Sequence, residues 1–324
     1  MIGALIGAVE QGFIYGIMAL GVYLTFRVLD FPDLTVDGSF VTGAATAAAM
    51  IVMGYSPALA TLVAIVVGFV AGVGTGLLHT KGGINPLLSG ILMMIALYSI
   101  NLRIMGWTVE NSVGRPNIPL LQSETLFSKY TAWATSLGIP VEISIILFAA
   151  IGVAVVKLAL DAFLKTEVGL ALRATGDNKR MIRSFSGNTS TLTILGLGLS
   201  NGLVALSGAL IAQYGKFADV GMGIGMIVIG LASVIIGEAL FGTRSIVRVT
   251  LAVVIGAVIY RLVLAFALRI EFLDTGDMKL LTAAIVVLAL IVPGKLGETK
   301  KRLARKKQQS KSVIKGGADL VNHS

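Results

Sequence analysis

Cysteine is absent from this 324-residue chain, and charged residues are scarce. Without cysteine there is no disulfide, thiolate metal site or cysteine nucleophile. Only 13% of the residues are charged, whereas soluble domains carry about 25%. The two histidines, His79 and His323, have no neighbour suggesting a metal site or a catalytic triad, and no G-x-x-x-x-G-K-[ST] loop is present to cradle ATP phosphates. We therefore expect no enzymatic activity, cofactor or bound metal in this chain.

Long apolar runs make up most of the chain. Hydrophobic residues account for 56% of the sequence, and the mean hydropathy is +0.89. About 20 apolar residues cross a bilayer as a helix. The runs predict an all-α, polytopic membrane protein with a transmembrane domain at 1–294 and a basic tail at 295–324. Gly68, Gly72 and Gly76 are spaced for close helix packing. The nine predicted spans are residues 3–26, 36–53, 57–79, 84–100, 141–163, 191–213, 223–242, 246–268 and 278–293.

Two of these runs also fit another description. The second is rich in alanine and glycine, and the last is short, so both are compatible with partly re-entrant segments.

Positive charge predicts the orientation of the chain. The loop 164–190 is rich in Lys and Arg, and the tail holds nine of the 26 basic residues. Cytoplasmic loops carry such an excess. We therefore expect the N-terminus outside, the C-terminus inside and the loop 101–140 outside. Because much of the net charge of +9 lies in this tail, it indicates contact with anionic lipid rather than with nucleic acid.

The loop 164–190 contains signals for two short helices. One is predicted from Glu167 to about Ala174, with Gly176 as its stop. The other is predicted to start at an Asp177 cap and to end before Gly187. Its apolar residues share one face, so the element could lie on lipid or dock into a groove of another protein. The pattern alone favours neither.

This loop also carries a resemblance to a known family. The run GLALRATGDNKRMIRSFSGN resembles the cytoplasmic coupling loop of ATP-binding-cassette (ABC) permeases for branched-chain amino acids and ribose-type sugars. The matching positions are Gly169, Ala171, Leu172, Arg173, Ala174, Gly176 and Asn178. The segment Asp33, Leu34, Thr35, Val36 and the stretch 199–242 are also similar to this family, and the resemblance covers roughly residues 8–270. Within the family, the chain resembles Gram-positive permeases, some of them paired with lipoproteins proposed to bind tryptophan or tyrosine.

The resemblance implies the permease subunit of an importer in the bacterial cell membrane. Its expected partners are cytoplasmic ATP-binding subunits, an external solute-binding lipoprotein and a second permease chain, in a homodimer or pseudo-dimer. The expected solute is small, an amino acid with a branched or aromatic side chain. Together, the resemblance and the helix pattern predict contact with the ATPase by Glu167, Gly169, Leu170, Ala171, Leu172, Arg173, Ala174, Gly176, Asp177, Met181 and Ile182.

Polar residues within apolar runs are candidates for the translocation path, because such residues are costly in lipid. Asp33, Thr35 and Asp37 lie at a break between two runs, where transporters often place solute sites. An ordinary turn is the alternative. Glu10 is a further candidate, for which a helix-packing hydrogen bond is the alternative. Gln213, at the end of the sixth predicted span, could meet the solute or the binding protein.

Glu238 and Arg261 lie in the seventh and eighth predicted spans. We expect them to form a buried ion pair. The alternative function is an ion-coupled secondary transporter, in which Glu238 and Glu10 are the candidate coupling residues.

Overall fold

The computed structural model describes residues 2–108, 114–184 and 187–267, together with residues 280, 282–284, 286 and 287. In this part of the chain, eight helices are long and apolar enough to cross a membrane. They are α1 (Ile2–Tyr23) with its π-helical continuation η1 (Leu24–Val28), α2 (Thr35–Val52), α3 (Pro57–Thr80), α4 (Pro86–Gly106), α6 (Val141–Lys165), α9 (Thr189–Gly215), α10 (Met226–Phe241) with a preceding 3-10 turn η2 (Val220–Gly223), and α11 (Ile246–Ala267).

The all-α fold and the first eight predicted spans are confirmed. The largest difference is in α4, which ends at Gly106 rather than near residue 100. The ninth predicted span, at 278–293, lies largely outside the described residues.

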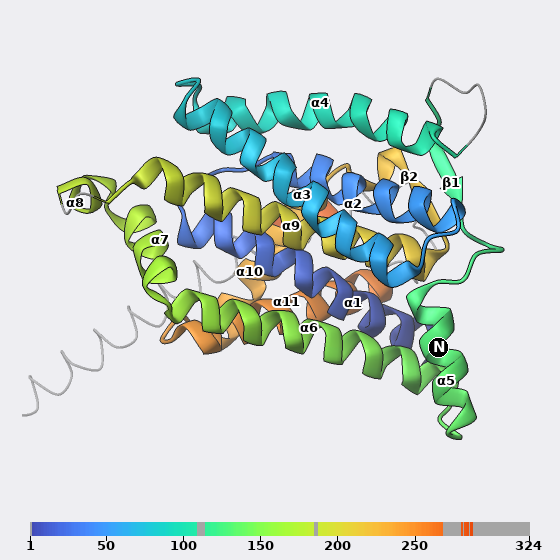
Figure 1. The fold of residues 1–324 in the computed structure, drawn as a ribbon. Coiled ribbons are helices and arrows are strands. Elements are labelled where there is room, and N and C mark those ends of the chain that lie inside the picture. Colours follow the sequence, from blue (N-terminus) through green and yellow to red (C-terminus); the bar gives the residue numbers. More distant parts are fainter. Residues whose placement is uncertain are drawn as a thin grey trace, which may run out of the picture.

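The long helices run side by side, and short elements lie at the two ends of the bundle (Figure 1). One end, the α7/α8 end, carries α7 (Glu167–Asp177) and α8 (Lys179–Ser184). The other, the α5 end, carries α5 (Leu126–Ser136), the strands β1 (Asn117–Pro119) and β2 (Phe217–Asp219), and the N-terminus. The charge distribution predicts that the α7/α8 end is cytoplasmic.

Helix α9 packs against α1, α2 and α3. At Gly68 and Gly72 of α3 there is no room for a Cβ, because Ala205 and the backbone of α9 lie against them. Gly208 of α9 lies equally close to the backbone at Phe40 of α2. The predicted close packing of the α3 glycines is thus confirmed, and it brings three helices together without bulky side chains between them.

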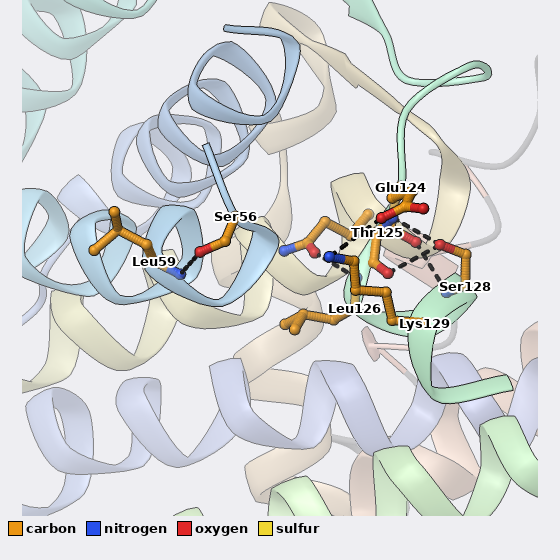
Figure 2. A network of polar contacts seen from close by, with 8 residues as sticks. Ser56, Leu59, Glu124, Thr125, Leu126, Ser128 and Lys129 are labelled. Atoms are coloured by element: carbon orange, nitrogen blue, oxygen red, sulfur yellow. Dashed lines mark hydrogen bonds and ion pairs between the residues drawn. The ribbon is translucent and has the colours of Figure 1, made fainter. Parts of the chain in front are cut away.

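Within the predicted loop 101–140, the described residues from 114 onward form a strand and a helix at the α5 end. Strands β1 and β2 pair antiparallel, with Ile118 opposite Ala218. Helix α5 starts with a capping box, in which Ser128 N donates to Thr125 Oγ1 (3.2 Å) and Thr125 N donates to Ser128 Oγ (2.8 Å; Figure 2). The capping box defines the start of α5, and the bond from the Leu126 amide to Gln213 of α9 (3.0 Å) attaches this start to the bundle.

The two helices predicted in the loop 164–190 form, but their boundary differs from the prediction. Helix α7 runs through Gly176 to Asp177. Asn178, not Asp177, caps α8, because its Oδ1 accepts from the amides of Arg180 and Met181, each at 3.1 Å. Gly176 lies in the last turn of α7 and does not end the helix. The glycine instead allows α7 to approach the backbone of Val28 in η1 closely.

Candidate functional site

The break between η1 and α2 holds a fully buried carboxylate. Asp33 Oδ1 accepts from Thr35 N (2.9 Å), and Asp33 Oδ2 accepts from Asn201 Nδ2 (2.7 Å). Thr35 in turn shares a hydrogen bond of 2.7 Å with Thr75 of α3. Burial raises the pKa of Asp33, and the bonds from Thr35 and Asn201 partly oppose that rise. The network ties the break to α3 and α9.

Asp37, one turn further on, caps a different helix. Its two carboxylate oxygens accept from the amides of Gly225 (2.9 Å) and Ile227 (2.8 Å), at the start of α10. Gly225 has a φ of +88°, which glycine adopts without strain. The chain from η2 runs back along α2, with Gly223 against Val41 and Asp37. Helix α10 therefore begins alongside the first turns of α2, and the seventh span is discontinuous.

A cavity of about 440 Å³ lies beside this discontinuity, and we call it the α2–α4 cavity. It is lined by Asp37, Gly38, Val41, Met94, Ile95, Tyr98, Ser99, Asn101, Val220, Gly223 and Ile224. Tyr98, Ile95 and Ile224 are more than half exposed, so they form its mouth. Asp37 is the one predicted path residue among those that line it.

Two other predicted path residues lie elsewhere, towards the α5 end. Glu10 Oε2 accepts from the hydroxyl of Tyr214 at 2.7 Å. Gln213 donates to Thr61 Oγ1 (2.8 Å), and its Oε1 accepts from the Leu126 amide (3.0 Å) at the start of α5. Gln213 therefore joins α3, α9 and α5, as a packing hydrogen bond would.

Helix α7 has a buried inner face. Leu172 is fully buried, and at Gly169 the backbone of Phe163 and Leu164 leaves no room for a Cβ. These residues seat α7 on the bundle rather than meeting a partner. The exposed predicted contact residues are Glu167, Leu170, Arg173, Asp177 and Met181, while Ala171, Ala174, Gly176 and Ile182 are half-buried.

A second cavity, of about 710 Å³, lies between η1 and α7. It is lined by Tyr23, Phe26, Arg27, Val28, Asp30, Leu170, Arg173, Ala174, Gly176 and Asp177. Leu170 and Arg173, two of the residues predicted to contact the ATPase, thus share a concave surface with the π-turn that continues α1.

The expected ion pair between Glu238 and Arg261 is wrong. Glu238 pairs with Arg27 of η1, whereas Arg261 lies over the Tyr15 ring, 4.5 Å from its centroid. Arg27 lies 211 residues from Glu238 in the sequence, so no local sequence pattern links the two residues.

Four further polar residues were given no role from the sequence. Lys157 Nζ lies 2.6 Å from Asp161 Oδ2, and Asp161 Oδ1 accepts from Thr250 Oγ1 at 2.7 Å. The spacing of four residues between Lys157 and Asp161 in an apolar run could have indicated this pair. Asn201 and Asn101 were the others, and no sequence pattern around them indicates their partners.

A discontinuous span beside a cavity that holds Asp37, in a bundle with a helix pair at one end, defines the class as a polytopic membrane transport protein. The family model described as "Branched-chain amino acid transport system / permease component" matches residues 4–292. No solved structure matches the chain.

Two relatives align over most of their length. The "Tyrosine transport system permease protein" of Clostridioides difficile is 45% identical over 314 residues, which is 96% of this chain and 99% of the relative. An uncharacterized protein of Rickettsia prowazekii is 35% identical over 292 residues, 88% of this chain and 96% of the relative. The chain therefore belongs to the permease components of branched-chain amino acid transport systems, multi-pass proteins of the bacterial cell membrane.

Proposed function

We propose that this chain is the membrane-spanning subunit of an ABC importer for an amino acid with an aromatic or branched side chain. It works as a homodimer with two cytoplasmic ATP-binding subunits, and an external lipoprotein delivers the solute. The name of the C. difficile relative supports the solute class. The observation that carries the ATPase partnership is the geometry of α7, a helix seated in the bundle by its inner face and exposed on its outer face.

The proposal includes a route for the movement of the ATPase. Gly176 of α7 lies against the Val28 carbonyl of η1, so a shift of α7 pushes on the end of α1. Arg27, in the same π-turn, pairs with Glu238 of α10. Helix α10 starts at Asp37, on the wall of the α2–α4 cavity. A rigid-body shift at the α7/α8 end would thus reach the cavity through packed helices.

Copurification with the cognate ATPase tests the docking surface. Leu170→Glu and Arg173→Glu change exposed residues of α7, so both should lower ATPase recovery without lowering permease yield. The lipid-surface alternative makes the opposite prediction. In that case, neutralising Lys179, Arg180 and Arg183 together should weaken binding to anionic vesicles, and the two α7 variants should recover the ATPase normally.

Uptake into proteoliposomes separates the importer from the ion-coupled alternative. The candidate coupling acids are both partnered, Glu10 with Tyr214 and Glu238 with Arg27. We expect uptake of radiolabelled tyrosine or leucine to require ATP, the ATPase and the binding lipoprotein. Uptake driven by a proton gradient without these partners would contradict the importer proposal.

A further inference from the structure

We propose that the α2–α4 cavity binds the ammonium group of the transported amino acid, with Asp37 as counter-ion and Asn101 as second hydrogen-bond acceptor. This assignment rests on the proposed transport of an amino acid. It adds the residues that recognise the solute and the end of the solute that they recognise.

Asn101 holds an unused acceptor at the cavity. The residue is 1% exposed, and its Nδ2 donates to the Gly38 carbonyl at 3.2 Å. Because a carbonyl can only accept, this bond fixes the orientation of the amide. Oδ1 is buried and has no partner among the described residues. A buried acceptor without a donor destabilises a fold. Oδ1 is closed off from the cavity in this conformation, so a ligand that donates hydrogen bonds reaches it only when the wall around Asn101 opens.

Asp37 makes the site selective for positive charge. Its oxygens accept from the amides of Gly225 and Ile227 and also face the Met226 amide at the start of α10, but a carboxylate offers about four lone-pair sites, so acceptor capacity remains. The start of a helix carries only about half a positive charge, which leaves the carboxylate and helix end together negative. Among the described residues that line the cavity there is no Lys or Arg. An ammonium group is therefore attracted, and a carboxylate is not.

The remaining walls suit an apolar side chain. Met94, Ile95 and Tyr98 of α4 face Val41 of α2 and Val220 of η2 across the cavity. Its volume of about 440 Å³ falls within the roughly 300–1,000 Å³ of small-molecule sites. The carboxylate of Asp37 and the apolar side chains around it match the two parts of an aromatic or branched amino acid.

Thiol protection in the purified permease tests binding directly, because the chain has no cysteine of its own. Tyr98→Cys places a single thiol at the exposed mouth. In nanodiscs, tyrosine and tyramine should slow its reaction with a maleimide, as both carry the ammonium group. The analogue 3-(4-hydroxyphenyl)propionate, which lacks that group, should not. Leucine, isopentylamine and 4-methylpentanoate form a second set of compounds with and without the ammonium group. This set is needed because the proposal does not choose between an aromatic and a branched side chain of the solute.

Asn101→Leu in the Tyr98→Cys background removes the acceptor and should abolish protection. In proteoliposomes, Asn101→Leu should lower uptake about tenfold or more, as expected for losing a hydrogen bond to a charged group, with normal ATPase recovery. Glu124→Gln, a change at an exposed residue that does not line the cavity, is the control and should keep wild-type uptake.

The outcomes separate this site from the importer proposal. Equal protection by the analogues with and without ammonium, or no protection in either set, overturns the site even if the wild-type protein transports. Protection by the ammonium compounds alone, with no ATP-dependent uptake, supports the site and overturns the importer. The protection result does not depend on folding of the Asn101 variant.

Discussion

Asp37 satisfies the first amides of α10 from a position 188 residues earlier in the chain. Asp37→Ala leaves the amides of Gly225 and Ile227 without their acceptor. Replacing a helix cap typically costs about 0.5–2 kcal/mol, so we expect a lower melting temperature in detergent, together with reduced uptake. Asp37→Asn keeps one acceptor and should be intermediate in stability.

Glu124→Gln is the matched control, because the carboxylate of Glu124 is exposed and pairs only with the surface residue Lys129, at 3.2 Å. Such surface pairs contribute little, so its melting temperature should stay near that of the wild type. If the Asp37→Ala protein were as stable as the wild type, the proposed role of Asp37 as the cap of α10 would be contradicted.

The ion pair between Arg27 and Glu238 predicts a coupling that Arg261 does not share. The Arg27 side chain is 54% exposed and that of Glu238 is 11% exposed, so the pair should contribute about 1 kcal/mol or less. A double-mutant cycle with Arg27→Gln and Glu238→Gln should give that non-additive stability. The same cycle with Arg261→Gln and Glu238→Gln should be additive within error, and coupling there instead would favour the pairing expected from sequence.

For single residues, the sequence identifies the buried polar side chains but not their hydrogen-bond partners. The cost of polar groups in lipid was enough to single out Asp33, Asp37, Glu10, Gln213 and Glu238. Their partners depend on tertiary contacts, since the bond from Asn201 to Asp33 spans 168 residues. Composition therefore indicates which side chains need a partner but not which partner they find.

The contact between α7 and η1 gives a prediction for an element. Gly176→Ala places a Cβ against the Val28 carbonyl, so α7 should move from its seat, and both ATPase recovery and uptake should fall. Gly152→Ala on α6 is a matched control, because nothing lies within 4 Å of the added Cβ. Both changes replace a helical glycine and gain similar helix propensity, about 1 kcal/mol. The difference between them thus reports the collision, and equal behaviour would contradict the seating of α7.

The boundaries of α7 and α8 were predicted less well than their existence. Caps and stops were inferred from local residues, which placed the break at Gly176 and Asp177 rather than at Asn178. A glycine within a helix can serve close packing as well as termination, and only the contact with η1 decides between them. The η2 turn before α10 was missed for the same reason, since its position depends on α2.

The bundle as a whole was the most predictable level. A continuous apolar run must become a spanning helix in lipid, whatever its neighbours are. The order of the spans therefore follows from hydropathy, and eight are confirmed among the described residues. The arrangement around α9 could not be predicted, because glycine contacts such as Gly72 with Leu197 join distant parts of the chain. The α2–α4 cavity depends on that arrangement.

The orientation of the whole molecule is the last prediction. The basic loop and tail place the α7/α8 end in the cytoplasm, and the α5 end then faces outward. Gln122→Cys and Ser184→Cys introduce single thiols at exposed positions near opposite ends of the bundle, in a chain without native cysteine. In intact cells, an impermeant maleimide should label the first variant and not the second, while permeabilised cells should show labelling of both. Labelling of Ser184→Cys from outside would invert the orientation and remove the ATPase docking surface from the cytoplasm.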